Sequence, residues 1–308
     1  MTRHQLTRPL AVVGNVNVDL ILGPTAPWPQ PGTEVIVEHD ELRVGGAAGN
    51  AALAWAALGV PHQIAASTGN DAFGSWLRAG FGPSADRWTV EATSTTVSVG
   101  ITHPGDERTF FTTQGHLPAF SWESVAAMLD AEALRGGILL VCGSFLTGRL
   151  TADYAKLFDW ADAHGIDVAL DTGWPLAGWT EAVRAEVFGW LPRCRFLLLN
   201  EIEAAALAGV DGHAAAAAIL GPQLVEGGIV VTKLGPRGAS ARLADGSVVD
   251  CAAPRVAVVD TIGAGDVFNA GFLLALAQEK PLAEALAAGT TLASLAISTR
   301  PRRYESTI

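Results

Sequence analysis

The sequence predicts an α/β protein built around a mostly parallel β-sheet that helices cover on both faces. Short apolar runs, which are typical of buried strands, alternate along the chain with stretches of helical character. The chain has 308 residues, of which 49% are hydrophobic and only 17% are charged, so it can bury a large core. We therefore expect one large domain that spans residues 1–308 and carries small insertions.

Charge and cysteine content exclude several classes of protein. The net charge of -11 argues against nonspecific nucleic-acid binding, which requires a basic surface. No run approaches the ~18 apolar residues of a membrane span, and the polar start, Met1–Arg8, is unlike a signal peptide. The three cysteines are far apart, so no metal spacing or disulfide framework follows. We expect a cytoplasmic protein without a nucleic-acid or membrane partner.

The first predicted strand, Leu10–Gly14, runs into the polar segment Asn15–Asp19. In an open α/β sheet, polar residues beyond the carboxyl end of a strand face the ligand crevice. Asn17 and Asp19 are therefore candidates for binding the hydroxyl groups of a substrate. The alternative is a loop with local side-chain turns.

A second candidate segment is rich in glycine. Thr33–His39 alternates like a strand, and Val44–Asn50 then forms a glycine-rich turn that opens a helix ending at Gly59. Paired glycines, Gly45 and Gly46, allow a ligand to approach the backbone closely. Asn50, in the first turn of the helix, points toward the same space. Residues 63–69 are the next predicted strand.

A strand-rich patch then interrupts the alternation. Thr95–Thr102 and Arg108–Thr113 flank the turn Pro104–Glu107, which indicates a hairpin. Together with the strand near residue 33, these segments are too few for a core of their own. We expect a small β-sheet lid made of insertions at about 15–44 and 94–115. Arg108 is placed where it could reach an anionic or hydroxylated substrate, or it is a surface charge of the hairpin.

Alternation resumes toward the C-terminus, with predicted strands at 137–143, 168–171, 196–199 and 228–235 and a helix near 151–164. Asn200 and Glu203 lie at a strand-to-helix junction and can present oxygen atoms to a hydrated Mg²⁺. The alternative is a helix cap with Glu203 as the capping-box partner. The strand that contains Lys233 ends in a tight turn between Gly235 and Gly238.

The segment Asp260–Asp266 is the strongest candidate for chemistry. It follows Val256–Val259, which we predict to be a buried strand end, and precedes a helix over 267–276. The glycines at 263 and 265 allow successive backbone N–H groups to point inward at the positive end of that helix, which creates an anion site. Asp266 suits a base that removes a proton from an attacking hydroxyl group. The alternative is a helix N-cap.

The chain lacks the signatures of other nucleotide-binding and hydrolytic sites. Gly143–Gly148 has the glycine spacing of a P-loop, but Arg149 and Leu150 stand where Lys and Ser or Thr are required. No G-x-G-x-x-G follows the first strand, and no H-E-x-x-H, G-x-S-x-G or C-x-x-C occurs.

The motifs in hand resemble those of the ribokinase family of carbohydrate kinases, also called the PfkB family. D-T-I-G-A-G-D-V-F at Asp260–Phe268 is similar to the C-terminal signature of the family, and Gly45-Gly46 with Asn50 is similar to the N-terminal one. The N-x-x-E at Asn200–Glu203 and the Gly235–Gly238 turn fall in the same order. The resemblance covers essentially the whole chain.

The resemblance implies a ribokinase-like three-layer α/β/α fold with a central, mostly parallel sheet of about eight strands and a β lid. It implies that Asp266 is the catalytic base, acting on a substrate hydroxyl that is usually a terminal CH₂OH. It also implies that the amides of Gly263, Ala264 and Gly265 form an anion hole for the γ-phosphoryl group of ATP.

The remaining roles come partly from the resemblance, which matches Asp19, Gly46 and Asn50 to sugar-binding positions and Gly235 and Gly238 to a turn near the nucleotide, and partly from the residues themselves. The positions that would bind substrate are Asn17, Asp19, Gly45, Gly46, Asn50 and Arg108. The positions that would bind the nucleotide are Asn200, Lys233, Gly235, Gly238, Thr261 and Asn269, and Asn200 and Glu203 would support Mg²⁺ through water. In some members a monovalent cation such as K⁺ binds beside the anion hole, and Asp260 and Ile262 match part of that site.

The implied substrate is a five- or six-carbon sugar or sugar acid. Ala47-Ala48 stand where ribokinases tend to have a Lys, which disfavours ribose. The alternatives are a nucleoside kinase, with Phe110 and Phe111 stacking on the base, or an inactive sugar-sensing protein. Exposed strand edges of the lid favour a homodimer formed through the lid.

Overall fold

The computed structural model describes residues 6–105 and 108–304, so the predicted start Met1–Gln5 and the turn residues Asp106 and Glu107 lie outside the described residues. Its central sheet has eight strands in the order β14-β13-β12-β11-β10-β9-β1-β4. Neighbours from β4 to β12 are parallel, and β13 and β14 are antiparallel. The strands are β1 Leu10–Val13, β4 Gln63–Ala65, β9 Ile138–Cys142, β10 Asp167–Asp171, β11 Phe196–Asn200, β12 Ile229–Lys233, β13 Ala239–Arg242 and β14 Val248–Cys251.

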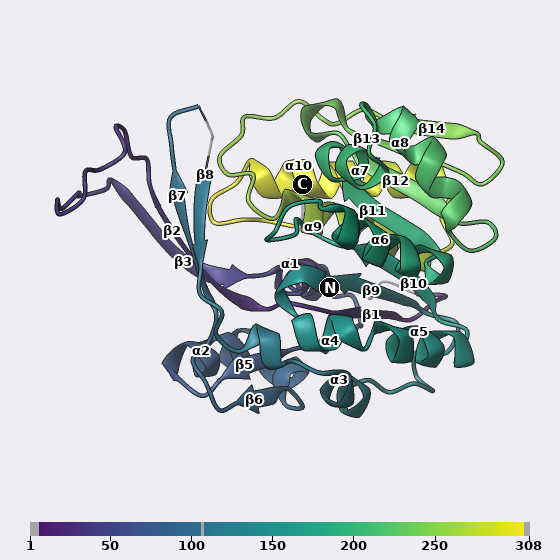
Figure 1. The fold of residues 1–308 in the computed structure, drawn as a ribbon, viewed down its shortest axis with the longest axis horizontal. Helices are drawn as coiled ribbons and strands as arrows, with labels where there is room; N and C mark the ends of the chain where they lie inside the picture. Colours follow the sequence, from purple (N-terminus) through teal and green to yellow (C-terminus); the bar gives the residue numbers. More distant parts are fainter. Residues whose placement is uncertain (1–5, 106–107, 305–308) are drawn as a thin grey trace.

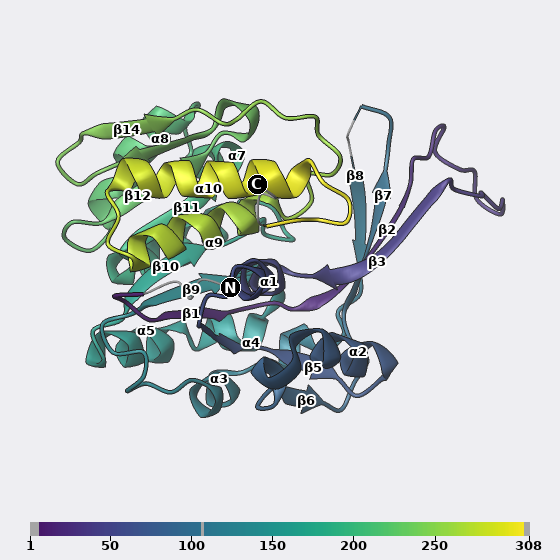
Figure 2. The ribbon, with the colours of Figure 1, turned by 180° about the vertical axis from the view of Figure 1, so that it is seen from behind.

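Helices cover both faces of this sheet, which confirms the predicted three layers. One face, toward the viewer in Figure 2, carries α1 Ala47–Ala57, α9 Ala264–Ala277 and α10 Leu282–Ile297. The other face, toward the viewer in Figure 1, carries α4 Gly148–Ala152, α5 Tyr154–Ala163, α6 Glu181–Trp190, α7 Glu201–Ala208 and α8 His213–Leu220, with α3 Trp122–Met128 below them. Parallel strands covered on both faces must be apolar throughout, and all five residues of β9 are buried.

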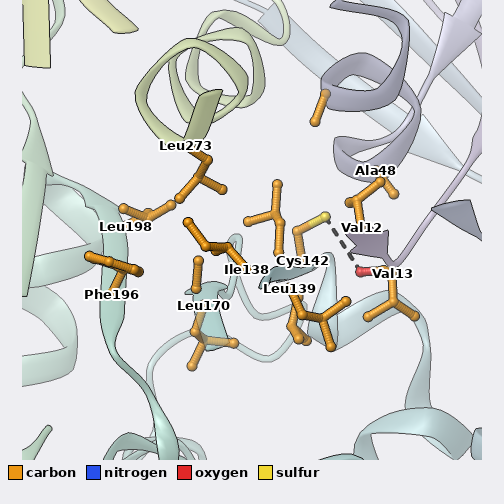
Figure 3. Packing of buried hydrophobic residues seen from close by; sticks show 14 of the residues in the cluster. Val12, Val13, Ala48, Ile138, Leu139, Cys142, Leu170, Phe196, Leu198 and Leu273 are labelled. Carbon is orange, nitrogen blue, oxygen red and sulfur yellow. Dashed lines mark hydrogen bonds between the residues drawn. The ribbon is translucent and has the colours of Figure 1, made fainter. Parts of the chain in front are cut away.

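The core is continuous across the sheet. Figure 3 shows Val12, Leu139, Leu170 and Leu198 on neighbouring strands, beneath Leu273 of α9. The thiol of Cys142 lies among them and donates to the carbonyl oxygen of Val13 at 3.7 Å. This packing fixes the relative positions of the strand ends from which the functional loops emerge.

A second sheet projects from one end of the molecule (Figures 1 and 2). Its strands have the order β3-β2-β7-β8, with β2 Asn17–Gly23, β3 His39–Gly45, β7 Val97–Thr102 and β8 Arg108–Thr112. It is the smaller, lid-like sheet that the sequence predicts. Its strands fall inside, or within a residue of, the predicted insertions 15–44 and 94–115, whose boundaries as lid insertions stay a prediction.

Two predicted strands need correction. Residues 33–38 form no strand, because β2 pairs with the seven residues of β3 in a register that runs from Asn17↔Gly45 to Gly23↔His39. The run 63–69 divides between two sheets: β4 joins the central sheet, whereas β5 Ser67–Gly69 pairs with β6 Thr89–Glu91 beside α2 Ala72–Phe81.

The prediction of a buried strand end at Val256–Val259 is also wrong. These residues form no strand, and Val258 is 50% exposed. The central sheet already ends at β14, so the segment returns along the surface toward α9. Its apolar side chains therefore remain accessible to a ligand.

In the described part of the chain, no single helix combines the length and apolar character of a bilayer-crossing segment. One pair of helices with a bend between them, Glu201–Ala208 and His213–Gln223, has this length and apolar character when the two are taken together, judged by length and composition alone.

Candidate active site

The crevice of this sheet lies where the strand order reverses. From β1 the chain passes to β4 on one side and later to β9 on the other, so the switch point lies between β1 and β9. Asn15 follows β1, Gly143 follows β9, and both line a cavity of about 420 Å³. The same cavity is lined by Asp266, so the fold brings the predicted base to the position where an α/β protein binds its ligand.

The first turn of α9 forms one wall of this cavity. Gly263 is its N-cap and has a left-handed backbone with φ of 74°, which glycine adopts without strain. Within the described residues, the N–H groups of Gly263 and Gly265 donate to no protein acceptor, whereas that of Ala264 donates to Thr261 O at 3.2 Å. The positive end of a 14-residue helix and two available amides therefore face the cavity.

Asp266 does not cap this helix. It is the third residue of α9, and its Oδ2 accepts a hydrogen bond from Asn50 Nδ2 at 2.8 Å. Burial raises the pKa of Asp266 to about 6, and the nearby Asp171 carboxylate adds to this effect. The Asn50 hydrogen bond, Lys233 and Arg302 act in the opposite direction. At neutral pH most of the carboxylate is ionised and able to accept a proton.

A buried network that sequence reasoning did not anticipate lies beside Asp266. Asp171, the last residue of β10, accepts from Lys233 Nζ at 2.7 Å and from Asn269 Nδ2 at 2.6 Å. Burial opposes the charge of Lys233, but Asp171 and Glu203 raise its pKa, so it stays a cation. Asp171 and Lys233 line the cavity. Asn269 does not line it; its side chain is only 1% exposed and donates to Asp171 from within the core. In the sequence, the only indication that Asp171 belongs to the site is its position at the end of a predicted strand.

Asn200 and Glu203 form the capping box that was the alternative interpretation of this pair. Glu203 N donates to Asn200 Oδ1 at 2.8 Å, and Asn200 N donates to Glu203 Oε2 at 3.0 Å. Both residues also line the cavity. Burial raises the pKa of Glu203 to about 7, with Asp171 as the next cause.

The donor set of the cavity fits a hydrated Mg²⁺. Mg²⁺ usually keeps several waters and binds one or two carboxylates together with substrate phosphates. Asp171 and Glu203 supply two carboxylates in one cavity. Across residues 6–105 and 108–304, no three or more His, Cys, Asp or Glu side chains form a group that could hold a metal ion by themselves.

A second cavity of about 580 Å³ continues from the first. The two share Lys233, Gly235, Thr261, Ala264 and Gly265. The second cavity is also lined by Gly238, Phe268, Ile297 and the exposed apolar segment that includes Val258. An elongated ligand with an apolar end and an anionic end therefore fits the combined cleft.

The predicted substrate residues Asn17, Asp19, Gly45 and Gly46 lie where the lid meets α1, and the first cavity is not lined by them. Asn17 Nδ2 donates to Asp19 Oδ1 at 2.8 Å, and burial raises the pKa of Asp19 to about 6. A Cβ atom on Gly45 would lie 2.1 Å from the Asp19 carboxyl carbon, so the close approach requires glycine. Asn15, which we did not single out, is the residue of this segment that faces the cavity, because β2 already begins at Asn17.

Arg108 connects the lid to the 260–266 loop. It lines a third cavity, of about 360 Å³, beneath the lid strands, and its Nη2 donates to the hydroxyl of Thr261. The structure thus directs this side chain toward the site rather than into a purely surface position.

Two further arginines surround Asp260. Arg43 of β3 donates from Nη1 to Asp260 Oδ2 at 2.5 Å. Arg302, in the tail after α10, donates from Nη2 to the carbonyl oxygen of Ile262 at 2.5 Å and to Asp260 Oδ2 at 3.4 Å. The tail shows no motif, so sequence reasoning did not connect Arg302 with the site.

The layers, the separate lid-like sheet and the cleft at the switch point define a ribokinase-like fold. In solved structures, ribokinase of Arabidopsis thaliana complexed with ribose and ATP superposes with a TM-score of 0.76 at 22% identity, covering 95% of this chain and 93% of that one. Adenosine kinase of Sinorhizobium meliloti superposes with a TM-score of 0.78 at 20% identity, covering 97% of each chain.

The sequence comparisons agree. The chain belongs to the pfkB family of carbohydrate kinases, whose profile matches residues 7–304. The sugar kinases of this family are phosphotransferases. Ribokinase of Haemophilus influenzae (strain ATCC 51907 / DSM 11121 / KW20 / Rd) is 24% identical over 311 aligned positions, which cover 95% of this chain and 93% of that protein.

Proposed function

We propose that the protein transfers the γ-phosphoryl group of ATP to a hydroxyl group, a terminal CH₂OH, of a five- or six-carbon sugar or sugar acid. The observation that carries this proposal is the hydrogen bond between Asn50 and Asp266. A residue of the predicted sugar-binding helix α1 donates directly to the predicted base on α9, beside two available amides. An acceptor hydroxyl and an anionic group can therefore be brought to the same carboxylate.

In the proposed reaction, Asp266 accepts the proton of the attacking hydroxyl. The sugar oxygen forms a bond to the γ-phosphorus atom, the bond from that atom to the β,γ-bridging oxygen breaks, and ADP leaves. The proton moves as charge develops on the sugar oxygen, so a carboxylate with a pKa of about 6 is basic enough. Most of the rate enhancement comes from alignment and charge neutralisation.

The phosphate end is supported by three groups. The amides of Gly263 and Gly265 at the positive end of α9 face the transferred group. Lys233 lies against them, with Nζ 3.3 Å from the position of a Cβ atom on Gly265. Mg²⁺, bound through water by Glu203 and Asp171 together with Asn200, would neutralise charge on the phosphates. The apolar second cavity suits the adenine base.

A sugar is favoured over a nucleoside by the placement of the lid aromatics. Phe111 stacks on Trp28, with ring centroids 6.1 Å apart, and is 53% exposed. Neither Phe110 nor Phe111 lines the cavity that contains Asp266 or the one beneath the lid. Two amide side chains suit hydroxyl recognition instead. Asn15 lines the same cavity as Asp266, and Asn50 donates a hydrogen bond to Asp266.

The lid is also the surface through which we propose that two copies associate. Leu42, Phe110 and Phe111 are each more than 40% exposed on its strands, and β3 and β8 are its edge strands. Sedimentation velocity measures the assembly state, with a Phe111→Asp variant expected to be monomeric.

A coupled assay of ADP release over a panel of sugars, sugar acids and nucleosides tests the function. We expect turnover with at least one sugar or sugar acid, and loss of that turnover in Asp266→Asn with binding of sugar and ATP within a few-fold of the original. Turnover with nucleosides alone would establish a nucleoside kinase. Ligand binding without any turnover would establish a sugar-sensing protein.

A further inference from the structure

The tail after α10 places a guanidinium group against the loop that carries the proposed anion hole. The side chain of Arg302 is only 14% exposed. Its Nη2 donates to Ile262 O at 2.5 Å, and its Nη1 lies 3.3 Å from the position of a Cβ atom on Gly263. The charge of Arg302 also opposes the rise that burial causes in the pKa of Asp266. A fixed positive charge therefore lies against the loop, next to the residue that caps α9.

The carbonyl oxygen that Arg302 contacts belongs to the same peptide unit as the N–H group of Gly263. A cation at the oxygen end of a peptide withdraws electron density from its N–H end and so strengthens hydrogen bonds that the N–H donates. The guanidinium also holds the loop in place through Asp260, whose Oδ1 accepts from Ile262 N at 2.9 Å. Arg302 thus both orients and polarises the loop without touching the reacting atoms.

These contacts do not leave room for the monovalent cation that the resemblance implies. Ile262 O and Asp260 Oδ2 are engaged by Arg302, and Asp260 Oδ2 is engaged by Arg43 as well. A K⁺ ion at the same oxygen atoms would lie beside two guanidinium groups and be repelled. The residues present therefore do not fit a K⁺ site.

We propose that Arg302 is a positioning residue that serves as the resident cation of the 260–266 loop and makes the protein independent of K⁺. The catalytic part of this inference rests on the proposed kinase function. The structural part does not, because it concerns which cation stabilises the folded loop.

Thermal unfolding in KCl and in tetramethylammonium chloride at equal ionic strength tests the structural part. The unaltered protein is expected to unfold within 1 °C of the same temperature in both salts. Arg302→Ala should unfold at a lower temperature, and K⁺ or guanidinium at millimolar concentration should restore part of the loss, because the carbonyl oxygen of Ile262 then loses its partner and Asp260 Oδ2 keeps only Arg43. The control is Arg149→Ala, an arginine of α4 whose side chain is 63% exposed, which should behave as the unaltered protein.

The same variants in the ADP-release assay test the catalytic part. Turnover of the unaltered protein should change less than twofold between the salts. Arg302→Ala should lose at least about tenfold in kcat and regain part of it with K⁺ or guanidinium, which a merely structural role would not produce. Selective stabilisation or activation of the unaltered protein by K⁺, or an Arg302→Ala protein that is unaffected or that no cation restores, would overturn the proposal. A panel without any turnover would reject the kinase function while leaving the unfolding result to decide on the cation.

Discussion

Replacement of Asp266 by Asn should make the protein more stable while it removes catalysis. Burial raises the pKa of this carboxyl group from 3.8 to about 6. Its contribution to stability is thus fully present below pH 3.8 and lost as the pH rises through about 6. The difference of about two pKa units corresponds to about 3 kcal/mol at pH 8, and partial exposure reduces the expected gain to about 1–3 kcal/mol. Asparagine can still accept from Asn50, so that hydrogen bond is retained.

The assay is urea and thermal unfolding of both proteins at pH 8 and pH 5. We expect Asp266→Asn to unfold about 1.5–4.5 °C higher at pH 8, because a chain of 308 residues shifts by about 1.5 °C per kcal/mol. The difference should shrink at pH 5, while turnover falls about 10²- to 10⁴-fold at the pH of the assay. The control is Asp211→Asn, an exposed carboxylate in the α7–α8 loop. A variant that is less stable at pH 8, or whose stability difference does not depend on pH, would refute the assignment of Asp266 as a destabilising buried carboxylate.

Three further predictions concern the groups around this carboxylate. Asn50→Leu removes the hydrogen bond that lowers the pKa of the base. The pH at which kcat/KM reaches half of its plateau should therefore rise from about 6 to a higher value, and an unchanged pH profile would contradict this role of Asn50. Gly45→Ala places a Cβ atom 2.1 Å from the Asp19 carboxyl group and should raise the substrate KM and cost about 1–3 kcal/mol, whereas Gly148→Ala, with no heavy atom within 4 Å of its Cβ, should do neither. Chelation of Mg²⁺ should abolish turnover reversibly, and Glu203→Gln should raise the Mg²⁺ concentration for half-activation about 10- to 100-fold; activity that persists in the chelator would reject a metal role.

The order of the elements was largely predictable from the sequence, because buried parallel strands such as β9 and β11 are continuous apolar runs. The same rule fails for Val256–Val259. Val256 and Val258 line the second cavity instead of a core, and a pattern of apolar residues does not distinguish the two. The strand predicted at 33–39 fails for a different reason, since the register with β2 favours His39–Gly45.

The candidate site could be proposed from the sequence where a motif is local and not where it depends on tertiary contacts. Asp266 and Gly263 lie in the same seven-residue motif, Asp260–Asp266, whose order is recognisable. Asp171 and Arg302 reach the site only because β10 ends beside Lys233 and the tail returns to Ile262. Neither residue belongs to a spacing pattern, so only the fold reveals them.

The hydrogen bond between Asn50 and Asp266 joins residues 216 positions apart. The helices that carry them, α1 and α9, are also joined by Trp55 Nε1, which donates to Ala270 O at 2.9 Å. During synthesis, Asn50 therefore leaves the ribosome 216 residues before Asp266, and the face of α1 that packs against α9 stays uncovered over that interval. A product of translation that stopped between the two helices would lack Asp266, so it could not carry out the proposed phosphoryl transfer.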